Sequence, residues 1–259
     1  MSATFTADYP ADGAADKDAS SRFGYDGGGA VAGYTANAVN FDGTNDYLSK
    51  ASAFTGAADS KLGTVSFWFK TTSVDVNRRI YIEDPSGFRV TLNNGQIVIQ
   101  GFNSAASNIL ILSTLSGTGT YNDGVWHHCA ASWDMANASN RHLIMDGSSD
   151  ISVGAFTNDT IDYTGTSLGF GAQHLGGEKI TADIADFQFI QGTYIDLSVA
   201  ANLQKFRTAA GKPADPALSG YSPILLLDGD TATWHTNDGS GGGMTENGAL
   251  TTASTSPSD

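Results

Sequence analysis

The sequence predicts an all-β protein that folds as a two-sheet antiparallel sandwich, and three observations support this prediction. Only three of the 27 acidic residues are glutamate, so the acid is almost entirely aspartate, and the chain also contains 31 glycines. Aspartate and glycine favour turns, whereas the glutamate and lysine of solvated helices are scarce. Short apolar runs are separated by turn signals about every 8–12 residues, which is typical of sandwiches and barrels.

Charge and apolar patterning exclude several classes of partner. A formal charge of −14 repels phosphate backbones, so we expect no nucleic-acid partner. The longest aliphatic run, residues 224–227, is far too short to span a bilayer, so we expect no membrane insertion. Cys129 is the single cysteine, which excludes an intrachain disulfide, and we expect it to be a small buried hydrophobe. The residues after Met1 lack a signal-peptide pattern, so we expect synthesis in a cytoplasm without export.

The strands follow from alternating and short apolar runs. Residues 1–36 have little apolar patterning and predict an N-terminal arm. We expect strands, in chain order, at residues 38–42, 47–49, 63–72, 79–82, 88–92, 97–100, 109–112, 124–133, 141–147, 167–171, 182–190 and 224–227. Apolar residues that alternate with polar ones face the core of a sandwich. We therefore expect Phe67, Phe69, Ile144 and Phe187 in the core.

One stretch, residues 198–207, has the apolar spacing of a helix. Val199, Leu203 and Phe206 fall on one face of it. Ser198 is the expected N-cap, and Gly211 followed by a proline ends the helical region.

The C-terminal extension follows this short helix. Residues 224–227 have no polar alternation, so the strand they form should be covered on both faces. The region before Phe41 offers no comparable apolar strand, and we expect residues 224–227 to take its place in a sheet. The alternative is a peripheral strand that packs on the helix or on a neighbouring subunit. The predicted organisation is an arm at 1–36, a β domain at 37–197, and an extension at 198–259 that completes the sandwich.

Five motifs in the β domain occur in an order that resembles laminin-G-like, concanavalin A-like jelly rolls. They are FDGTNDYL at 41–48, VSFWFK at 65–70, WHHCAA at 126–131, LIMDG at 143–147 and ADIADF at 182–187. In the last motif, Ala185 and Asp186 replace the Asp-Glu of the family. The resemblance covers about residues 37–197 and implies a two-sheet antiparallel jelly-roll sandwich. The same fold hosts lectins, adhesion modules and glycosidases, so it leaves the function open.

The extension carries a second resemblance. The segments FRTAAGKP at 206–213, PILLLDGD at 223–230, NDGSGG at 237–242 and TSP at 255–257 are similar to tails of jelly-roll proteins in tailed-phage structural modules. This resemblance implies a non-catalytic virion protein of a tailed phage, on the tail or the head surface. Its expected partners are other virion proteins, further copies of itself and host-surface polysaccharide. One rival is a carbohydrate-binding adhesion module of a bacterial surface protein, and the other is a glycosidase.

Catalytic candidates are weak. A glycosidase of this fold would need closely spaced carboxylates such as Glu-x-Asp-x-x-Glu, and the glutamates occur only at positions 83, 178 and 246. Asp183 and Asp186 are three apart, so on a regular strand they point to opposite faces. His127 and His128 are adjacent, so we expect one inside and one on the outer face, and the other histidines complete no zinc motif. We therefore expect no enzyme activity.

Two kinds of binding site are considered. Calcium prefers carboxylate and amide oxygens at loop ends, and relatives of the family bind calcium at the rim of the sandwich. The candidate ligands are Asp42, Asn45, Asp46, Asp146 and Asp183, although ordinary turns use the same residues. Aromatic rings at loops can stack on the apolar face of a sugar. The candidates are Tyr81, Phe102, Tyr121, Tyr163 and Trp234, although core packing explains most aromatic residues.

Overall fold

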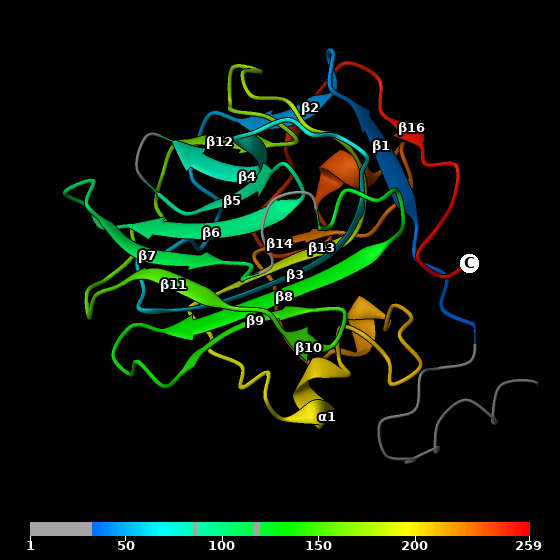
Figure 1. Ribbon diagram of the computed structural model, residues 1–259. Coiled ribbons are helices and arrows are strands. Elements are labelled where there is room, and N and C mark those ends of the chain that lie inside the picture. The colour runs from blue at the N-terminus through cyan, green and yellow to red at the C-terminus, as the bar shows by residue number, and fades with distance from the viewer. Residues whose placement is uncertain (1–32, 85–86, 116–119) are drawn as a thin grey trace, which may run out of the picture.

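The computed structural model describes residues 33–84, 87–115 and 120–259, which form two antiparallel sheets of eight strands each (Figure 1). Sheet A contains, in spatial order, β10 (Ser148–Ser149), β9 (Arg141–Met145), β8 (His127–Asp134), β3 (Leu62–Lys70), β13 (Thr181–Gln191), β1 (Ala38–Asp42) and β16 (Thr251–Thr252), with β14 (Leu225–Leu227) also paired to β13. Sheet B contains β11 (Ser152–Phe156), β7 (Asn108–Ser113), β6 (Gln96–Phe102), β5 (Arg89–Asn93), β4 (Arg78–Asp84), β12 (Ser167–Phe170), β2 (Tyr47–Lys50) and β15 (Thr245–Asn247). The predicted all-β sandwich is confirmed.

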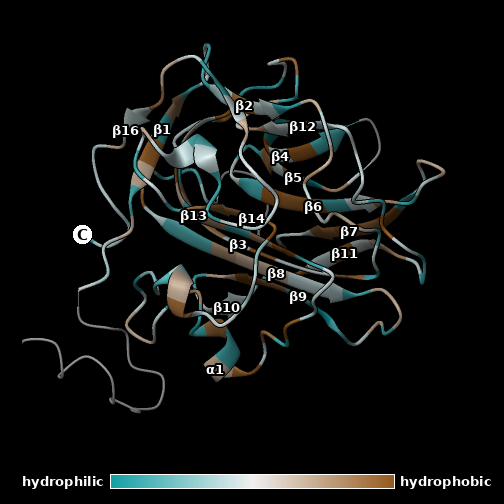
Figure 2. Cartoon of the chain, turned by 180° about the vertical axis from the view of Figure 1, so that it is seen from behind, coloured by the Kyte–Doolittle hydropathy of each residue, from teal (hydrophilic) through white to brown (hydrophobic). Residues whose placement is uncertain are grey.

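The main core lies between the two sheets and follows the predicted alternation. Phe67 and Phe69 on β3 and Phe187 on β13 are fully buried, as predicted. The rings of Phe67 and Phe187 stack with their centroids 5.6 Å apart. In Figure 2 brown segments are interspersed with white and teal ones along the strands of the two sheets. Burial of a large aromatic side chain stabilises the fold by about 1.5–3 kcal/mol.

Ile144 is buried, as predicted, but it belongs to a second apolar cluster and not to the main core. Its neighbours Leu143 and Met145 point into the main core, so Ile144 points to the outer face of sheet A. There it packs in a second apolar cluster with Ala130 and Phe206. The apolar run at 143–145 therefore serves both faces of β9, which alternation alone did not reveal.

The predicted helix is much shorter than its sequence pattern. Only α1 (Ala200–Leu203) is helical, and Val199 occupies the N-cap position without a side-chain hydrogen bond. Ser198 is not the cap, because its hydroxyl donates to the carboxylate of Asp196. Val199 is exposed, so it lies outside the expected apolar face, whereas Phe206 is buried against sheet A. Two short 3-10 turns follow, η1 (Pro216–Leu218) and η2 (Trp234–Thr236).

Strands from the C-terminal segment pair with both sheets. β14 pairs with residues 187–189 of β13, and β1 pairs with residues 181–185 of the same strand. β15 pairs with β2 in sheet B, and β16 pairs with β1 in sheet A. Leu225 and Leu227 point into the main core, while Leu226 points outward. Of the predicted N-terminal arm, residues 1–32 lie outside the described residues, and the three domain boundaries stay predictions.

Among the residues that the structure describes, none of the helices is both long enough and apolar enough to span a membrane.

Candidate functional site

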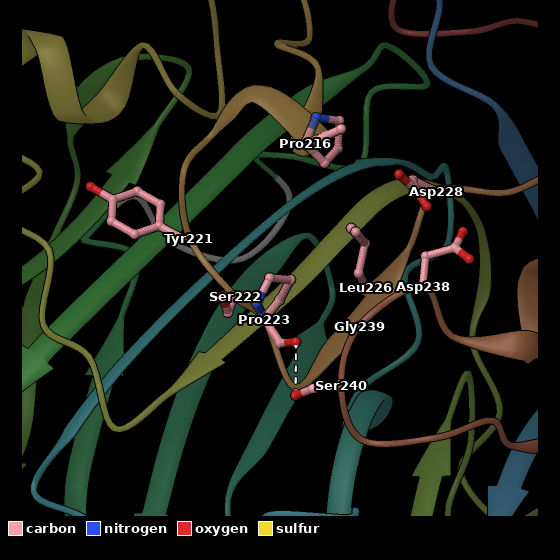
Figure 3. A pocket seen from close by; sticks show the side chains of 10 residues that line it. Pro216, Tyr221, Ser222, Pro223, Leu226, Asp228, Asp238, Gly239 and Ser240 are labelled. Atoms are coloured by element: carbon pink, nitrogen blue, oxygen red, sulfur yellow. Dashed lines mark hydrogen bonds between the residues drawn. The ribbon is translucent and has the colours of Figure 1, made fainter.

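A pocket of about 620 Å³ lies beside β14, on the outer face of sheet A (Figure 3). It is bordered by the η1 turn and the loop after it on one side and by the loop after η2 on the other. Leu226 supplies an apolar surface, because the neighbouring leucines of β14 point the other way into the core. The lining residues are Pro216, Ala217, Tyr221, Ser222, Pro223, Leu226, Asp228, Asp238, Gly239 and Ser240.

Asn237 organises the loop that forms one side of the pocket. Its side-chain oxygen accepts hydrogen bonds from the backbone amides of Leu226 and Gly239, both at 2.8 Å. Its amide nitrogen donates to the carbonyls of Ile224 and Gly242, both at 3.0 Å. The side chain thus hydrogen-bonds to backbone groups of residues 224 and 226 that would otherwise be unpaired at the edge of the sheet. These bonds hold the loop against β14. Its φ of 60° lies in the left-handed region, which asparagine tolerates better than most residues.

Tyr221 lines the pocket on the side away from Asp228 and Asp238, and its ring extends away from the other labelled side chains (Figure 3). Its ring is stacked with that of Phe206, with centroids 5.9 Å apart and planes 10° from parallel. Lys205 lies with its Nζ 5.6 Å from the centre of the Tyr221 ring and donates a 2.8 Å hydrogen bond to the carbonyl of Ser219. The ring is therefore held by the segment that follows α1, which keeps one edge of the pocket in place.

Asp228 and Asp238 bring two carboxyl groups side by side at the other end of the pocket (Figure 3). Burial, together with a hydrogen bond to Asp238 and the charge of that group, raises the pKa of Asp228 to about 6. The charge of Asp215 adds to this effect. Oδ1 of Asp228 is buried, and no donor in the described part of the chain hydrogen-bonds to it. Asp228 therefore keeps its proton to a higher pH than an ordinary aspartate does, and its Oδ1 is an unsatisfied acceptor.

Asp186 interacts electrostatically with Asp228, and it points to a different face of β13 than predicted. Asp183 and Asp186 were expected on opposite faces, but the register of β13 shifts between Ala185 and Gln188, and Asp186 has a φ of 48°. This bulge turns Asp186 to the outer face, where it accepts a 2.8 Å hydrogen bond from Tyr34. Burial raises the pKa of Asp186 well above its ordinary value, and the charge of Asp228 adds to the shift.

Three of the five aromatic residues predicted to bind sugar are buried in the main core. Tyr81, Tyr163 and Trp234 expose at most 2% of their surface, so their rings have no face for a ligand and the prediction is wrong for them. The other two are half-buried and outside the pocket. The guanidinium of Arg89 lies 4.3 Å from the centre of the Phe102 ring, and the Tyr121 hydroxyl donates to Asp150. Their role in binding stays a prediction.

Three of the five predicted calcium ligands, Asp42, Asn45 and Asp46, lie at the β1–β2 turn, and the four aspartates among the five accept hydrogen bonds from protein donors. Asp42 and Asp46 accept backbone amides in and beside the β1–β2 turn, where Asn45 also lies. Asp146 accepts from His127 and from the His128 amide, and Asp183 accepts from Asn40 and pairs with Lys70.

In the described ranges, no three His, Cys, Asp or Glu side chains converge as a metal site. A calcium site at these residues stays a prediction.

The pocket was missed by sequence reasoning because its residues belong to loops without periodicity. The carboxylates of Asp228 and Asp238 come together only after Asn237 folds the chain back onto β14. The weak signal was the run NDGSGG at 237–242, which indicates a tightly turned loop after an apolar strand.

The fold defines the class of the protein as a two-sheet antiparallel jelly-roll sandwich. Residues 42–195 match the family model of the concanavalin A-like lectin/glucanases superfamily, and the chain belongs to this family. Curated protein sequences give no significant match.

Among solved structures, the chain is similar to a heptameric SAP-like pentraxin from Limulus polyphemus, with 12% identity, 85% of this chain and 95% of that chain covered, and a TM-score of 0.55. It is also similar to a candidate carbohydrate-binding protein from Bacteroides ovatus, with 12% identity, 86% of this chain and 62% of that chain covered, and a TM-score of 0.57. At this identity the two likenesses concern the fold alone.

Proposed function

We propose that the protein is a non-catalytic glycan-binding protein whose binding site is the pocket beside β14. The observation that carries the proposal is the placement of an aromatic ring, Tyr221, and a carboxyl pair, Asp228 and Asp238, at two ends of one pocket of about 620 Å³. A pocket of this size holds a small sugar.

The chemistry of the lining suits a carbohydrate. A tyrosine ring packs on the apolar face of a pyranose, and carboxylates accept hydrogen bonds from its hydroxyl groups. Ser222 and Ser240 add hydroxyl groups along the same pocket. The fold shared with the Bacteroides ovatus protein supports the proposal by analogy.

The arrangement of the carboxyl pair argues against glycoside hydrolysis. Retaining and inverting enzymes place their two carboxyl groups about 5–10 Å apart, with the scissile bond between them. Asp228 and Asp238 instead lie side by side at one end of the pocket, so they do not flank a bond held between them (Figure 3). We therefore propose binding without turnover.

The biological setting that we propose is the virion of a tailed phage, with the protein on the tail or head surface and in contact with other virion proteins and with copies of itself. This part rests on the resemblance of the segments at 206–213, 223–230, 237–242 and 255–257 to tails of phage structural proteins. Host-surface polysaccharide would then be the ligand. Mass spectrometry of purified virions tests this setting, and absence of the protein from intact particles would overturn it.

Binding is tested on a panel of immobilised glycans, followed by calorimetry on the best ligand. We expect Tyr221→Ala to weaken binding by about five- to 150-fold, because stacking on an aromatic ring contributes about 1–3 kcal/mol. Tyr194→Ala is the matched control, since Tyr194 is half-buried on the same face but outside the pocket. Absence of any glycan binding by the unmodified protein, or equal binding by both variants, would overturn the proposal. Release of reducing sugar from the bound glycan would refute the non-catalytic part.

A further inference from the structure

We propose that two copies of this chain associate through the outer face of sheet B, at the end where β5, β6, β7 and β11 lie side by side (Figure 1). This inference specifies the contact between copies that belongs to the proposed function, and it does not depend on the glycan pocket, which lies on sheet A. Alternate residues of β6 and β7 point into the main core, so the others form the surface that we call the β6–β7 face. Its half-buried side chains include Gln96, Val98, Gln100, Phe102, Ile111 and Ser113.

The distribution of charge carries the first step. The chain has a formal charge of −14, so two copies repel each other wherever their acidic surfaces meet. Residues 90–122 and 151–158 contain no Asp, Glu, Lys or Arg, and these two segments supply β6, β7, β11 and most of β5. Within these four strands as the structure describes them, Arg89 is the one charged residue. Two copies can therefore meet through this face without bringing carboxylates together.

The side chains of the face are suited to contact with a second copy of the same face. In a two-fold contact each surface meets its own copy, so a charged group near the axis would oppose a like charge. The β6–β7 face instead combines the aliphatic side chains of Val98 and Ile111 with the amides of Gln96 and Gln100. A primary amide both donates and accepts hydrogen bonds, so it can pair with the same group of another copy, whereas a carboxylate or an ammonium cannot.

Phe102 favours a protein partner over a sugar on this face. The guanidinium of Arg89 lies 4.3 Å from the centre of the Phe102 ring and covers that side of it. A sugar could stack on this side of the ring only after displacing the arginine.

The strand at the edge of the face has little protection of its own. The other terminal strands of the two sheets, β10, β15 and β16, have only two or three residues each, and short edge strands are one way in which proteins avoid edge pairing. β11 has five residues without charge or proline, and Val153 is 38% exposed. A bulge between Val153 and Ala155 interrupts its register, so we place the contact on the face and not on a continuous sheet through two copies.

The size and the charge of the contact predict a weak dimer with a distinctive response to salt. Four strands about 4.8 Å apart and about six residues long give a projected area of about 400 Å² per copy, which is at the low end for specific contacts. Because the contact is formed by uncharged side chains while each copy carries a charge of −14, salt should strengthen the dimer by screening the repulsion between copies. A contact that depended on ion pairs would weaken under the same conditions.

Sedimentation velocity on the full chain tests the proposal, with protein from about 1 μM to about 1 mM. We expect a monomer–dimer equilibrium that is tighter at about 1 M salt, where the Debye length is about 3 Å, than at about 0.01 M, where it is about 30 Å. Ile111→Lys should weaken the dimer by more than about tenfold, because two lysines would oppose each other across the contact. This result is expected although the substitution makes the whole chain less negative.

Two further variants keep the test independent of folding and of total charge. Ser113→Lys replaces a polar side chain of the same face, so it should keep the fold and weaken the dimer in the same way. Val199→Lys is the matched control, because it adds the same charge at a side chain that is 45% exposed beside α1, on the far side of sheet A. It should leave the dimer intact, and thermal melting checks that each variant is folded.

The possible results separate this inference from glycan binding. A chain that stays monomeric at about 1 mM protein and high salt would overturn the inference, as would a dimer that weakens with salt. A dimer that both folded lysine variants of the face leave unchanged would also overturn it, because the copies would then meet elsewhere. Loss of glycan binding in folded Ile111→Lys without a change in mass would mean that the face binds a neutral sugar instead. Tyr221→Ala should leave the dimer unchanged, so either proposal can fail while the other stands.

Discussion

His127 Nδ1 lies 2.7 Å from Oδ2 of Asp146, and this contact helps to raise the pKa of His127, whereas the pKa of the next residue, His128, is lowered. Burial lowers the pKa of His127, but the hydrogen bonds and charges of Asp146 and Asp123 outweigh it and raise the pKa overall. His128 points to the outer face, where burial and the charge of Arg207 lower its pKa to about 3. The two histidines point to opposite faces of sheet A, as expected, and both are buried.

We predict that His128 destabilises the fold in acid. A lowered folded pKa means that the unfolded chain binds the extra proton, so stability is lost as the pH falls from about 6.5 towards 3, by about 1.4 kcal/mol for each pH unit. His128→Gln should flatten this part of the profile, measured as the free energy of unfolding in urea from pH 4 to pH 7. His127→Gln is the matched control. It should instead remove stability that is present at low pH and lost as the pH rises through the raised pKa of His127.

We predict that Glu83→Gln stabilises the protein at neutral pH. Glu83 is buried, and burial raises its pKa to about 8, so the folded state keeps a proton that the unfolded chain releases above about pH 4.5. Stability is therefore lost as the pH rises from 4.5 through 8. Glutamine removes this loss and can still accept the 2.7 Å hydrogen bond from the Tyr81 hydroxyl. We expect a gain of about 1–3 kcal/mol at pH 7 by chemical denaturation and almost none at pH 4. Equal effects at both pH values would contradict the assignment.

We predict that Phe67→Ala costs roughly 3–5 kcal/mol of the free energy of unfolding. Its ring is fully buried between the sheets and stacked on Phe187, so truncation leaves a cavity. Val74→Ala at a side chain that is 70% exposed is the control and should change stability by less than about 0.5 kcal/mol. An unchanged melting temperature for Phe67→Ala would mean that the faces of β3 are assigned wrongly.

We predict that deletion of residues 220–259 leaves an insoluble or molten chain. The deletion removes β14, β15 and β16, which pair with β13, β2 and β1. It exposes edges of both sheets and apolar core residues that Leu225 and Leu227 cover. A shorter deletion of residues 253–259 spares all three strands and should unfold cooperatively. A soluble 1–219 chain that melts near the full-length temperature would show that the sandwich is complete without its tail.

The fold was predictable because its signal is local and repeated. The alternation around Phe67 and Phe69 identifies β3 and its inner face without any other strand. Ile144 is buried as predicted, but its burial depends on a second apolar layer, formed with Phe206, that covers the outside of sheet A. Asp186 was misplaced because a bulge breaks the period of two. Such features depend on what packs against the strand, which a single strand does not encode.

The candidate site was largely unpredictable for a different reason. Tyr221, Asp228 and Asp238 have no regular spacing, and their meeting depends on the four side-chain hydrogen bonds of Asn237. The predicted sugar-binding aromatic residues failed for the opposite reason, because residues expected at the surface are buried. Tyr81 and Trp234 lie near turns in the sequence, yet both are buried in the main core. Exposure of a large ring is a tertiary property, so aromatic residues near loops are poor predictors of sugar contacts.

The shared edge of β13 has a consequence for synthesis on the ribosome. β1 pairs with residues 181–185 of that edge, and β14 pairs with residues 187–189. Residues 187–189 are therefore synthesised before the strand that pairs with them. Until residues 225–227 leave the exit tunnel, residues 187–189 have unpaired backbone N–H and C=O groups next to Phe187 and Phe189, which are buried in the folded protein. Slowed elongation between these points would lengthen that exposure and increase aggregation, whereas holding chaperones would counter it.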